Sequence, residues 1–379
     1  MLVRTAALLA LALAACDAGP AAVDVAPKFL WTFAPDSYFS GRDFLDASAF
    51  STDAVVLANV PPGGTAGSVG LTALDVQRGT VAWHQDRIGW LLHPPHATSP
   101  LYFAPYESAP GSALGAYTHV DRIDAHTGQT IARTPLQRQP TLDFELRMVW
   151  SARYLLVIDE AGLTAFDWTT GAPRWNVPLD SSAYLFPPLV LGDRLYVAGN
   201  PVRVLSIVDG SQLAAVPGEC CTLIASPDGK HVFVRSAADA SIELDEQLRV
   251  VRHTTGEVKA ASNTYYATTT AGDGQPVHVY RYDRADPVFT LTAQDAKDYF
   301  GALALAGSTL YYFHHADATL SAHDLDTGAT RLVDTVGSHF VISTDAVGTA
   351  GPYMGSPPIV EPPYLFTEEW GVHAYRIGN

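Results

Sequence analysis

The sequence repeats one short pattern four times, and this repetition restricts the possible folds more than any other feature. Each copy has alternating apolar residues, an aspartate, a turn that ends in glycine, and a second alternating run. The copies are LTALDVQRGTVAW (71–83), VDRIDAHTGQTIA (120–132), LTAFDWTTGAPRW (163–175) and LSAHDLDTGATRL (320–332). Alternation with a period of two is typical of half-buried β-strands. Each copy therefore predicts two strands joined by a tight turn.

The aspartate and glycine of each copy are expected to build that turn. An aspartate side chain accepts hydrogen bonds from backbone amides of its own turn, and glycine adopts the positive φ that such turns require. The predicted turn residues are Asp75 with Gly79, Asp124 with Gly128, Asp167 with Gly171, and Asp324 with Gly328. The copies lack the density of carboxylates that a calcium loop needs, so we expect no metal in them.

Weaker copies of the pattern occupy the intervals between the clear ones. They place further turns near positions 208, 245, 283 and 376, which gives a mean spacing of about 43 residues between turns. A four-stranded propeller blade needs roughly 40–50 residues. The sequence therefore predicts an all-β fold, an eight-bladed β-propeller of four-stranded antiparallel blades that spans residues 28–379.

The last of these blades lacks a fourth strand after Val372–Ile377, and the N-terminal segment offers one. Lys28–Phe33 resembles the strand that follows the turn in the clear copies, and its Trp31 matches Trp83 and Trp175. We expect this strand to close the last blade, which removes the exposed edges of an open sheet. We also expect Trp31, Trp83 and Trp175 to pack between neighbouring blades.

The first sixteen residues, MLVRTAALLALALAAC, have the features of a bacterial lipoprotein signal. Arg4 precedes a ten-residue apolar run, which as a helix rises only about 15 Å and is too short to span a hydrocarbon core of about 30 Å. Leu13–Cys16 resembles the lipoprotein box, so we expect removal of residues 1–15, lipidation of Cys16 and a flexible tether over 16–27. The alternative is an ordinary secretory signal that leaves Cys16 as a free thiol.

These features predict a location in the bacterial cell envelope. The propeller is expected in the periplasm or at the cell surface, and Asp17 leaves open whether the inner or the outer membrane is used. The net charge of −16 argues against nucleic acid as a partner and against binding an anionic membrane by charge. We therefore expect contact with the membrane through the lipid anchor only.

The phrases LTALDVQRGTVAW and SPPIV resemble the repeat of the pyrroloquinoline-quinone-type (PQQ-type) β-propellers. The resemblance covers residues 28–379 and is clearest in four or five blades. One branch of these propellers contains periplasmic quinoprotein dehydrogenases, which hold a quinone and a calcium ion at the propeller axis. Another contains non-catalytic envelope lipoproteins, notably the propeller subunit of the outer-membrane β-barrel assembly machinery. The layout of this sequence is similar to the second branch.

Cys220 and Cys221 are the only cysteines besides Cys16, and they are adjacent. The dehydrogenases carry a disulfide between neighbouring cysteines against their quinone, but the calcium ligands and long insertions of that site are not identifiable here. Two alternatives stay open, namely a strained vicinal disulfide and a pair of buried thiols.

The resemblance implies a membrane-anchored, non-catalytic scaffold, a monomeric ring that binds envelope proteins, with outer-membrane protein assembly as the best-defined example. The alternative is a periplasmic PQQ-dependent-like oxidoreductase, or another enzyme with its site at the propeller axis. The sequence contains no Gly-rich phosphate loop, no Gly-x-Ser-x-Gly elbow and no His-Glu-x-x-His motif. We therefore expect no catalytic residue, cofactor or metal ligand.

Overall fold

The computed structural model describes eighteen segments of the chain, and each of them contains β-structure. The segments are 28–33, 48–50, 54–60, 70–92, 101–108, 115–136, 147–151, 153–159, 162–179, 188–216, 223–237, 240–270, 275–292, 303–314, 319–335, 359–361, 364–368 and 372–376. The described residues contain no helix, so none of them belongs to a helix that could cross a membrane. The prediction of an all-β fold is confirmed.

The strands of the described segments form eight antiparallel sheets, in which hydrogen-bonded neighbours are mostly neighbours in sequence. The first four sheets consist of β2 (Ser48–Phe50), β3 (Ala54–Val60), β4 (Gly70–Asp75) and β5 (Val81–Gln85); β6 (Gly89–Leu92), β7 (Leu101–Ser108), β8 (Gly115–Tyr117), β9 (His119–Ile123) and β10 (Thr130–Pro135); β11 (Arg147–Trp150), β12 (Tyr154–Asp159), β13 (Gly162–Asp167) and β14 (Pro173–Val177); and β15 (Leu189–Leu191), β16 (Arg194–Val197), β17 (Val202–Ser206) and β18 (Gln212–Val216).

The other four sheets follow the same plan, except that the last contains strands from both ends of the described chain. They consist of β19 (Leu223–Ala225), β20 (Val232–Ala237), β21 (Ala240–Leu244) and β22 (Val250–His253); β23 (Glu257–Ala261), β24 (Tyr265–Thr269), β25 (Val277–Arg281) and β26 (Phe289–Leu291); β27 (Leu303–Ala306), β28 (Thr309–His314), β29 (Thr319–Asp324) and β30 (Thr330–Thr335); and β31 (Ile359–Glu361), β32 (Tyr364–Glu368), β33 (Val372–Arg376) and β1 (Lys28–Phe33).

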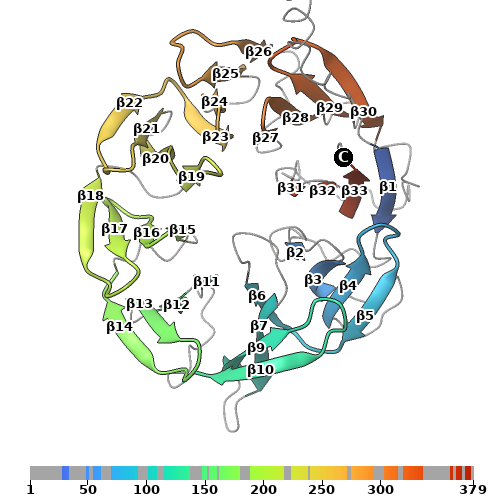
Figure 1. Cartoon of the computed structure of the whole chain (residues 1–379), viewed down its shortest axis with the longest axis vertical. Helices are drawn as coiled ribbons and strands as arrows, with labels where there is room; N and C mark the ends of the chain where they lie inside the picture. Colours follow the sequence, from blue (N-terminus) through green and yellow to red (C-terminus); the bar gives the residue numbers. More distant parts are fainter. Residues whose placement is uncertain are drawn as a thin grey trace, which may run out of the picture.

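The sheets follow one another around a ring (Figure 1). The first strand of each sheet faces the centre of the ring, and the last strand lies on the rim. β1 pairs with β33 from Lys28 opposite Arg376 to Phe33 opposite Val372, so it takes the rim position of its sheet. The arrangement confirms the prediction of several four-stranded antiparallel sheets.

One sheet differs from the predicted four strands. β7 is eight residues long, and only its first part, residues 101–103, pairs with β9. Residues 106–108 extend beyond β9 and pair with β8, a short strand that the sequence pattern did not predict. This sheet therefore has five strands, because β7 is long enough to take part in two separate pairings.

The hydrophobic core is divided into layers between neighbouring sheets. Leu155 and Leu156 are adjacent on β12, yet they point to opposite faces and join two different clusters of buried side chains. Leu156 packs with Leu163 of its own sheet and with Leu195 and Leu205 of the next sheet. Because both faces of a middle strand are covered, third strands such as β13 are buried along nearly their whole length.

The structure has turns at the predicted positions near 208 and 283, at residues 207–209 and 282–283, but in each the residue that corresponds to the aspartate lies two positions earlier. We use "turn position" for the residue at the end of the strand that precedes the rim strand, or directly after that end. In the clear copies it is Asp75, Asp124, Asp167 or Asp324. In the fourth sheet this residue is Ser206 rather than 208, since Gly210 N donates to Ser206 O at 2.9 Å, as Gly79 N does to Asp75 O. In the sheet β23–β26 it is Arg281 rather than 283, because Arg281 pairs with Tyr265 as Asp167 pairs with Tyr154.

Candidate functional site

The four predicted Asp–Gly pairs lie in turns between third and fourth strands. In each turn Oδ1 of the aspartate accepts hydrogen bonds from the backbone N–H of the second and third residues after it, at 2.8–3.0 Å. The glycine has a φ between 67° and 74° and donates its N–H to the aspartate carbonyl at 2.8 Å. Asp167 also accepts hydrogen bonds from Arg174, and these lower its pKa to about 2. The aspartates therefore use their hydrogen-bonding capacity within their own turns.

Of the three predicted tryptophans, Trp83 and Trp175 have described side chains, and both connect neighbouring sheets. Trp83 Nε1 donates to Ala125 O at 2.9 Å, and Trp175 Nε1 donates to Ile207 O at 3.0 Å. Each acceptor directly follows the turn position of the next sheet. Each indole ring also lies against the turn glycine there, since a Cβ added to Gly128 would lie 2.8 Å from the Trp83 ring. The strand of Trp31 pairs so that Trp31 lies opposite Ala374, but its side chain is outside the described residues.

Other residue types occupy the tryptophan position in the remaining sheets. Trp83 and Trp175 lie opposite Ala73 and Ala165, two residues before the turn position. The same register places Arg252 on β22 opposite Glu243, and Phe289 on β26 opposite Val279. The corresponding residues of the other sheets are Ala132, Ala214 and Arg331.

Arg252 makes the connection that an indole makes elsewhere, and it adds a charge. Its Nη2 donates to Tyr282 O at 2.6 Å, the carbonyl that follows turn position Arg281. Its Nη1 donates to the Tyr266 hydroxyl at 2.9 Å, with the guanidinium 5.3 Å from the centre of that ring. Its Nε lies 3.2 Å from Oε2 of Glu243, which is only 2% exposed. Arg252 therefore holds a buried carboxylate and an aromatic ring together between two sheets.

Stacked aromatic rings surround this arginine. The His231 ring stacks on Tyr282 with 3.6 Å between ring centres, and its Nδ1 lies 2.6 Å from Oε1 of Glu243. Tyr266 stacks on Tyr280 at 5.2 Å. Burial raises the pKa of Tyr266 and of Tyr282 above the ordinary tyrosine value. Both phenols are therefore neutral at physiological pH.

Two pockets lie on either side of the turn at residues 281–288, which joins β25 to β26. Pocket A, of about 450 Å³, is lined by Arg252, His253, Thr254, Thr255, Tyr266, Tyr280, Tyr282, Asp283, Arg284 and Ala285. Pocket B, of about 600 Å³, is lined by Tyr265, Arg281, Arg284, Ala285, Asp286, Pro287, Val288, Leu325 and Asp326. Arg284 and Ala285 line both, so the two pockets are adjacent.

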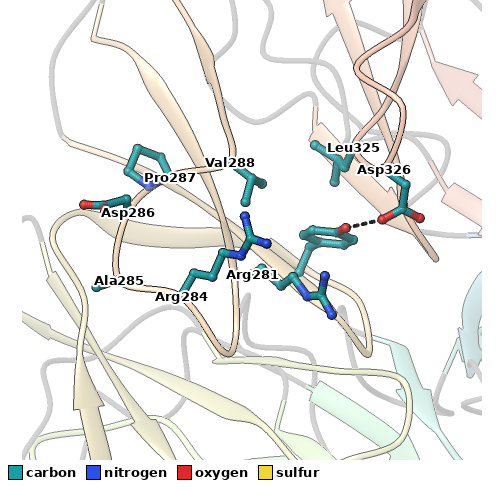
Figure 2. A pocket seen from close by; sticks show the side chains of 9 residues that line it. Arg281, Arg284, Ala285, Asp286, Pro287, Val288, Leu325 and Asp326 are labelled. Atoms are coloured by element: carbon teal, nitrogen blue, oxygen red, sulfur yellow. Dashed lines mark hydrogen bonds between the residues drawn. The ribbon is translucent and has the colours of Figure 1, made fainter.

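Figure 2 shows pocket B from close by. The side chains of Arg281 and Arg284 lie on the side of the turn that faces Leu325 and Asp326, whereas the Asp286 carboxylate points away. The Tyr265 hydroxyl donates to Oδ1 of Asp326 at 2.5 Å. Burial and then this hydrogen bond raise the pKa of Tyr265 to about 12.

The lining of the two pockets combines guanidinium groups, carboxylates and tyrosine rings. Guanidinium groups form charge-assisted hydrogen bonds to carboxylates, and tyrosine rings supply flat contact area beside them. The sequence analysis did not select these residues. The signal that could have found them is YRYDR (280–284), which places two arginines within five residues of a chain that has 23 lysines and arginines in total.

A second charged cluster lies between the first two sheets. Asp121 on β9 is fully buried, and its Oδ1 accepts a hydrogen bond from Arg133 Nε at 2.8 Å. Arg87, in the connection from β5 to β6, donates to Oδ2, and His119 Nε2 lies 3.6 Å from Oδ1. Burial alone would raise the pKa of Asp121, but the hydrogen bonds from Arg133 and Arg87 lower it. Burial lowers the pKa of His119.

The remaining predicted site residues cannot be placed. Cys16, the tether over 16–27, the signal over 1–15, and the pair Cys220 and Cys221 all lie outside the described residues. Within the described segments, no group of three or more His, Cys, Asp and Glu side chains is arranged to hold a metal ion.

Known proteins match this chain in part of the sequence and in the fold. A family model described as "Outer membrane protein assembly factor BamB" matches residues 116–216, and no curated protein matches the sequence. The crystal structure of BamB from Moraxella catarrhalis superimposes with a TM-score of 0.57 at 11% identity, covering 93% of this chain and 100% of that chain. Residues 116–216 therefore resemble the PQQ-type repeat of BamB, and the fold of the chain resembles the BamB propeller.

Two further solved structures give lower scores. KlHsv2 with loop 6CD replaced by a Gly-Ser linker has a TM-score of 0.48 at 10% identity, covering 81% of this chain and 97% of that chain. Hsv2 from Kluyvelomyces marxianus has a TM-score of 0.46 at 11% identity, covering 74% and 93%.

Proposed function

We propose that this chain is a non-catalytic propeller scaffold that binds protein partners in the bacterial envelope and takes part in outer-membrane protein assembly. The observation that carries the proposal is the similarity to BamB, which extends over 93% of this chain and all of the Moraxella catarrhalis structure. The family model for outer membrane protein assembly factor BamB supports it over residues 116–216.

The proposal includes a closed ring of eight blades. The eight sheets would be the blades, and β1 would complete the last one by its pairing with β33. Trp31 would then pack toward the next blade as Trp83 and Trp175 do. A rigid ring suits a scaffold because its turns hold partner-binding residues in fixed positions.

The proposal also includes a lipid anchor. Cys16 would carry the acyl chains, and residues 16–27 would hold the ring clear of the membrane surface. More than one acyl chain is needed for stable anchoring, since a single chain binds only marginally.

Crosslinking in intact cells tests the scaffold function. A photo-reactive amino acid at Ala285, which lines both pockets, is expected to capture envelope proteins. The matched control is the same amino acid at Gln77, an exposed residue in the turn between β4 and β5. Specific adducts from Ala285 support the proposal and place the partner at the 281–288 turn.

A complete lack of envelope partners from any rim position would contradict the scaffold. The enzyme alternative is tested by incubating the purified protein with quinone and calcium. Stoichiometric binding together with dye-linked alcohol oxidation would overturn the proposal.

A further inference from the structure

Pocket A, between the sheets β19–β22 and β23–β26, contains almost no aliphatic surface. Nine of its ten lining residues carry a polar group, and Ala285 is the exception. Its large apolar surfaces are therefore tyrosine rings. Tyr280 is half-buried, and its stacking on the buried Tyr266, with 5.2 Å between ring centres, fixes the plane of its ring. A ligand for this pocket needs a face that packs on an aromatic ring and polar groups around that face.

The charges around the pocket balance one another. The turn at residues 281–288 holds two arginines and two aspartates. Arg281 Nε lies 3.1 Å from Asp283 Oδ1, and Arg252 Nε lies 3.2 Å from Oε2 of the buried Glu243. The lining therefore selects neither an anion nor a cation. It presents guanidinium groups, which only donate hydrogen bonds, beside carboxylates, which only accept them.

We propose that pocket A binds a neutral saccharide. A pyranose ring would pack the C–H groups of one face on the Tyr280 ring, whose face carries partial negative charge. Its hydroxyl groups, which both donate and accept, would bond to the exposed Arg284 and to the free lone pairs of Asp283. The volume of about 450 Å³ lies within the usual range for small-molecule sites. The inference goes beyond the proposed scaffold function and does not depend on it.

Two observations favour a neutral saccharide over other small ligands. An aliphatic ligand would find only Ala285 and the tyrosine rings as apolar contacts and would leave the other polar groups of the lining without partners. An anionic ligand would meet the field of a chain with a net charge of −16, without a local excess of cations to offset it. A neutral ligand is indifferent to that field.

Saturation-transfer NMR with the purified protein tests the site. The probes are the neutral trisaccharides maltotriose and chitotriose, which distinguish plain hydroxyl sugars from acetamido sugars. One control is mannitol, which has hydroxyl groups but no ring face, and the other is trigalacturonate, which has ring faces and carboxylates. At least one neutral trisaccharide should receive saturation, strongest on the C–H groups of one ring face. Its affinity should not change between about 0.05 and 0.5 M sodium chloride, because no ionic contact is screened.

Substitutions test the contribution of the tyrosine ring. Tyr280→Leu should weaken trisaccharide binding about fivefold to tenfold, and Tyr280→Phe, which keeps the ring, about twofold at most. Tyr154→Leu is the matched control, because Tyr154 is also half-buried and its ring contacts Trp175 in another sheet. Arg284→Ala changes an exposed residue and should weaken binding about fivefold through the lost hydrogen bond. Urea midpoints would show whether each variant is folded.

Four results would overturn the inference: no binding of either neutral trisaccharide, equal binding of mannitol, stronger binding of trigalacturonate, or an equal effect of Tyr280→Leu and Tyr154→Leu. A neutral trisaccharide affinity that falls as salt rises would also contradict it. Envelope proteins captured from Ala285 by a chain that binds no saccharide would overturn the saccharide site and leave the scaffold standing. Saccharide binding by a chain without envelope partners would do the reverse.

Discussion

The contact between a tryptophan and the next turn glycine predicts different costs for one substitution at two equivalent positions. Gly128 and Gly328 both have a φ of +74° in the same kind of turn. A Cβ on Gly128 would lie 2.8 Å and 2.9 Å from two atoms of the Trp83 ring. A Cβ on Gly328 would have no atom of the described residues within 4 Å. Alanine should therefore destabilise the protein more at Gly128.

The size of the effect follows from two contributions. A left-handed backbone costs an L-residue about 1–2 kcal/mol, and the lower entropy of the unfolded chain offsets about 0.4–1 kcal/mol of this. Gly328→Ala should therefore cost about 1 kcal/mol. Gly128→Ala must also displace the indole, which adds about 1–3 kcal/mol of overpacking and disturbs the hydrogen bond to Ala125. Its expected total is about 2–4 kcal/mol.

Urea unfolding followed by circular dichroism measures both variants, with the midpoints compared at equal slope. Trp83→Ala supplies the control, because it removes the ring that a Cβ on Gly128 would meet. In that background Gly128→Ala should cost only the backbone contribution, a coupling of about 1–3 kcal/mol. Equal midpoint shifts for Gly128→Ala and Gly328→Ala in the wild-type chain would refute the reasoning.

Three further predictions concern the charged cluster around Asp121, the strand β1 and Cys16. Folding lowers the pKa of Asp121 and of His119, so the unfolded chain binds protons more readily at both groups. The free energy of unfolding should therefore decrease as the pH is lowered below about 6.5 for His119 and below about 3.9 for Asp121. Asp121→Asn should therefore be less stable at pH 7 by about 3 kcal/mol and show a flatter acid limb in urea titrations against pH. Deleting residues 28–33 should lower the melting temperature and broaden the transition in calorimetry, and an unchanged melt would contradict a role of β1 in closing the ring. Cys16→Ala should move the protein from the membrane fraction to the soluble fraction, and mass spectrometry of the wild type should find an acylated N-terminal cysteine.

The sequence was most informative where local chemistry alone determines the backbone. The copy of the pattern at 163–175 predicts two strands, and the structure has them at Gly162–Asp167 and Pro173–Val177. Turn positions without aspartate were harder to predict, because Ser206 gives the same backbone pattern with a different side chain. Leu248 likewise adopts a φ of 62° in the turn after β21, where no glycine marks the left-handed residue.

The sequence pattern did not predict the two pockets. Their residues come from three segments, 252–255, 265–288 and 325–326, which belong to three consecutive sheets. Alternation predicts which face of a strand is buried, but it does not predict which side chain of the next sheet lies opposite. Arg252 shows the difficulty, because it occupies a position that holds tryptophan in other sheets.

The pairing of β1 with β33 has a consequence for the order of events during synthesis. Seven of the eight sheets consist of strands that are near one another in sequence, so each can form soon after its own segment emerges. The remaining sheet needs Lys28 and Arg376 together, from opposite ends of the described chain. At a synthesis rate of roughly 5–20 residues per second, β33 is made tens of seconds after β1. During that interval its unpaired edge is open to a strand of another copy, so newly made chains are most exposed to mispairing at this strand.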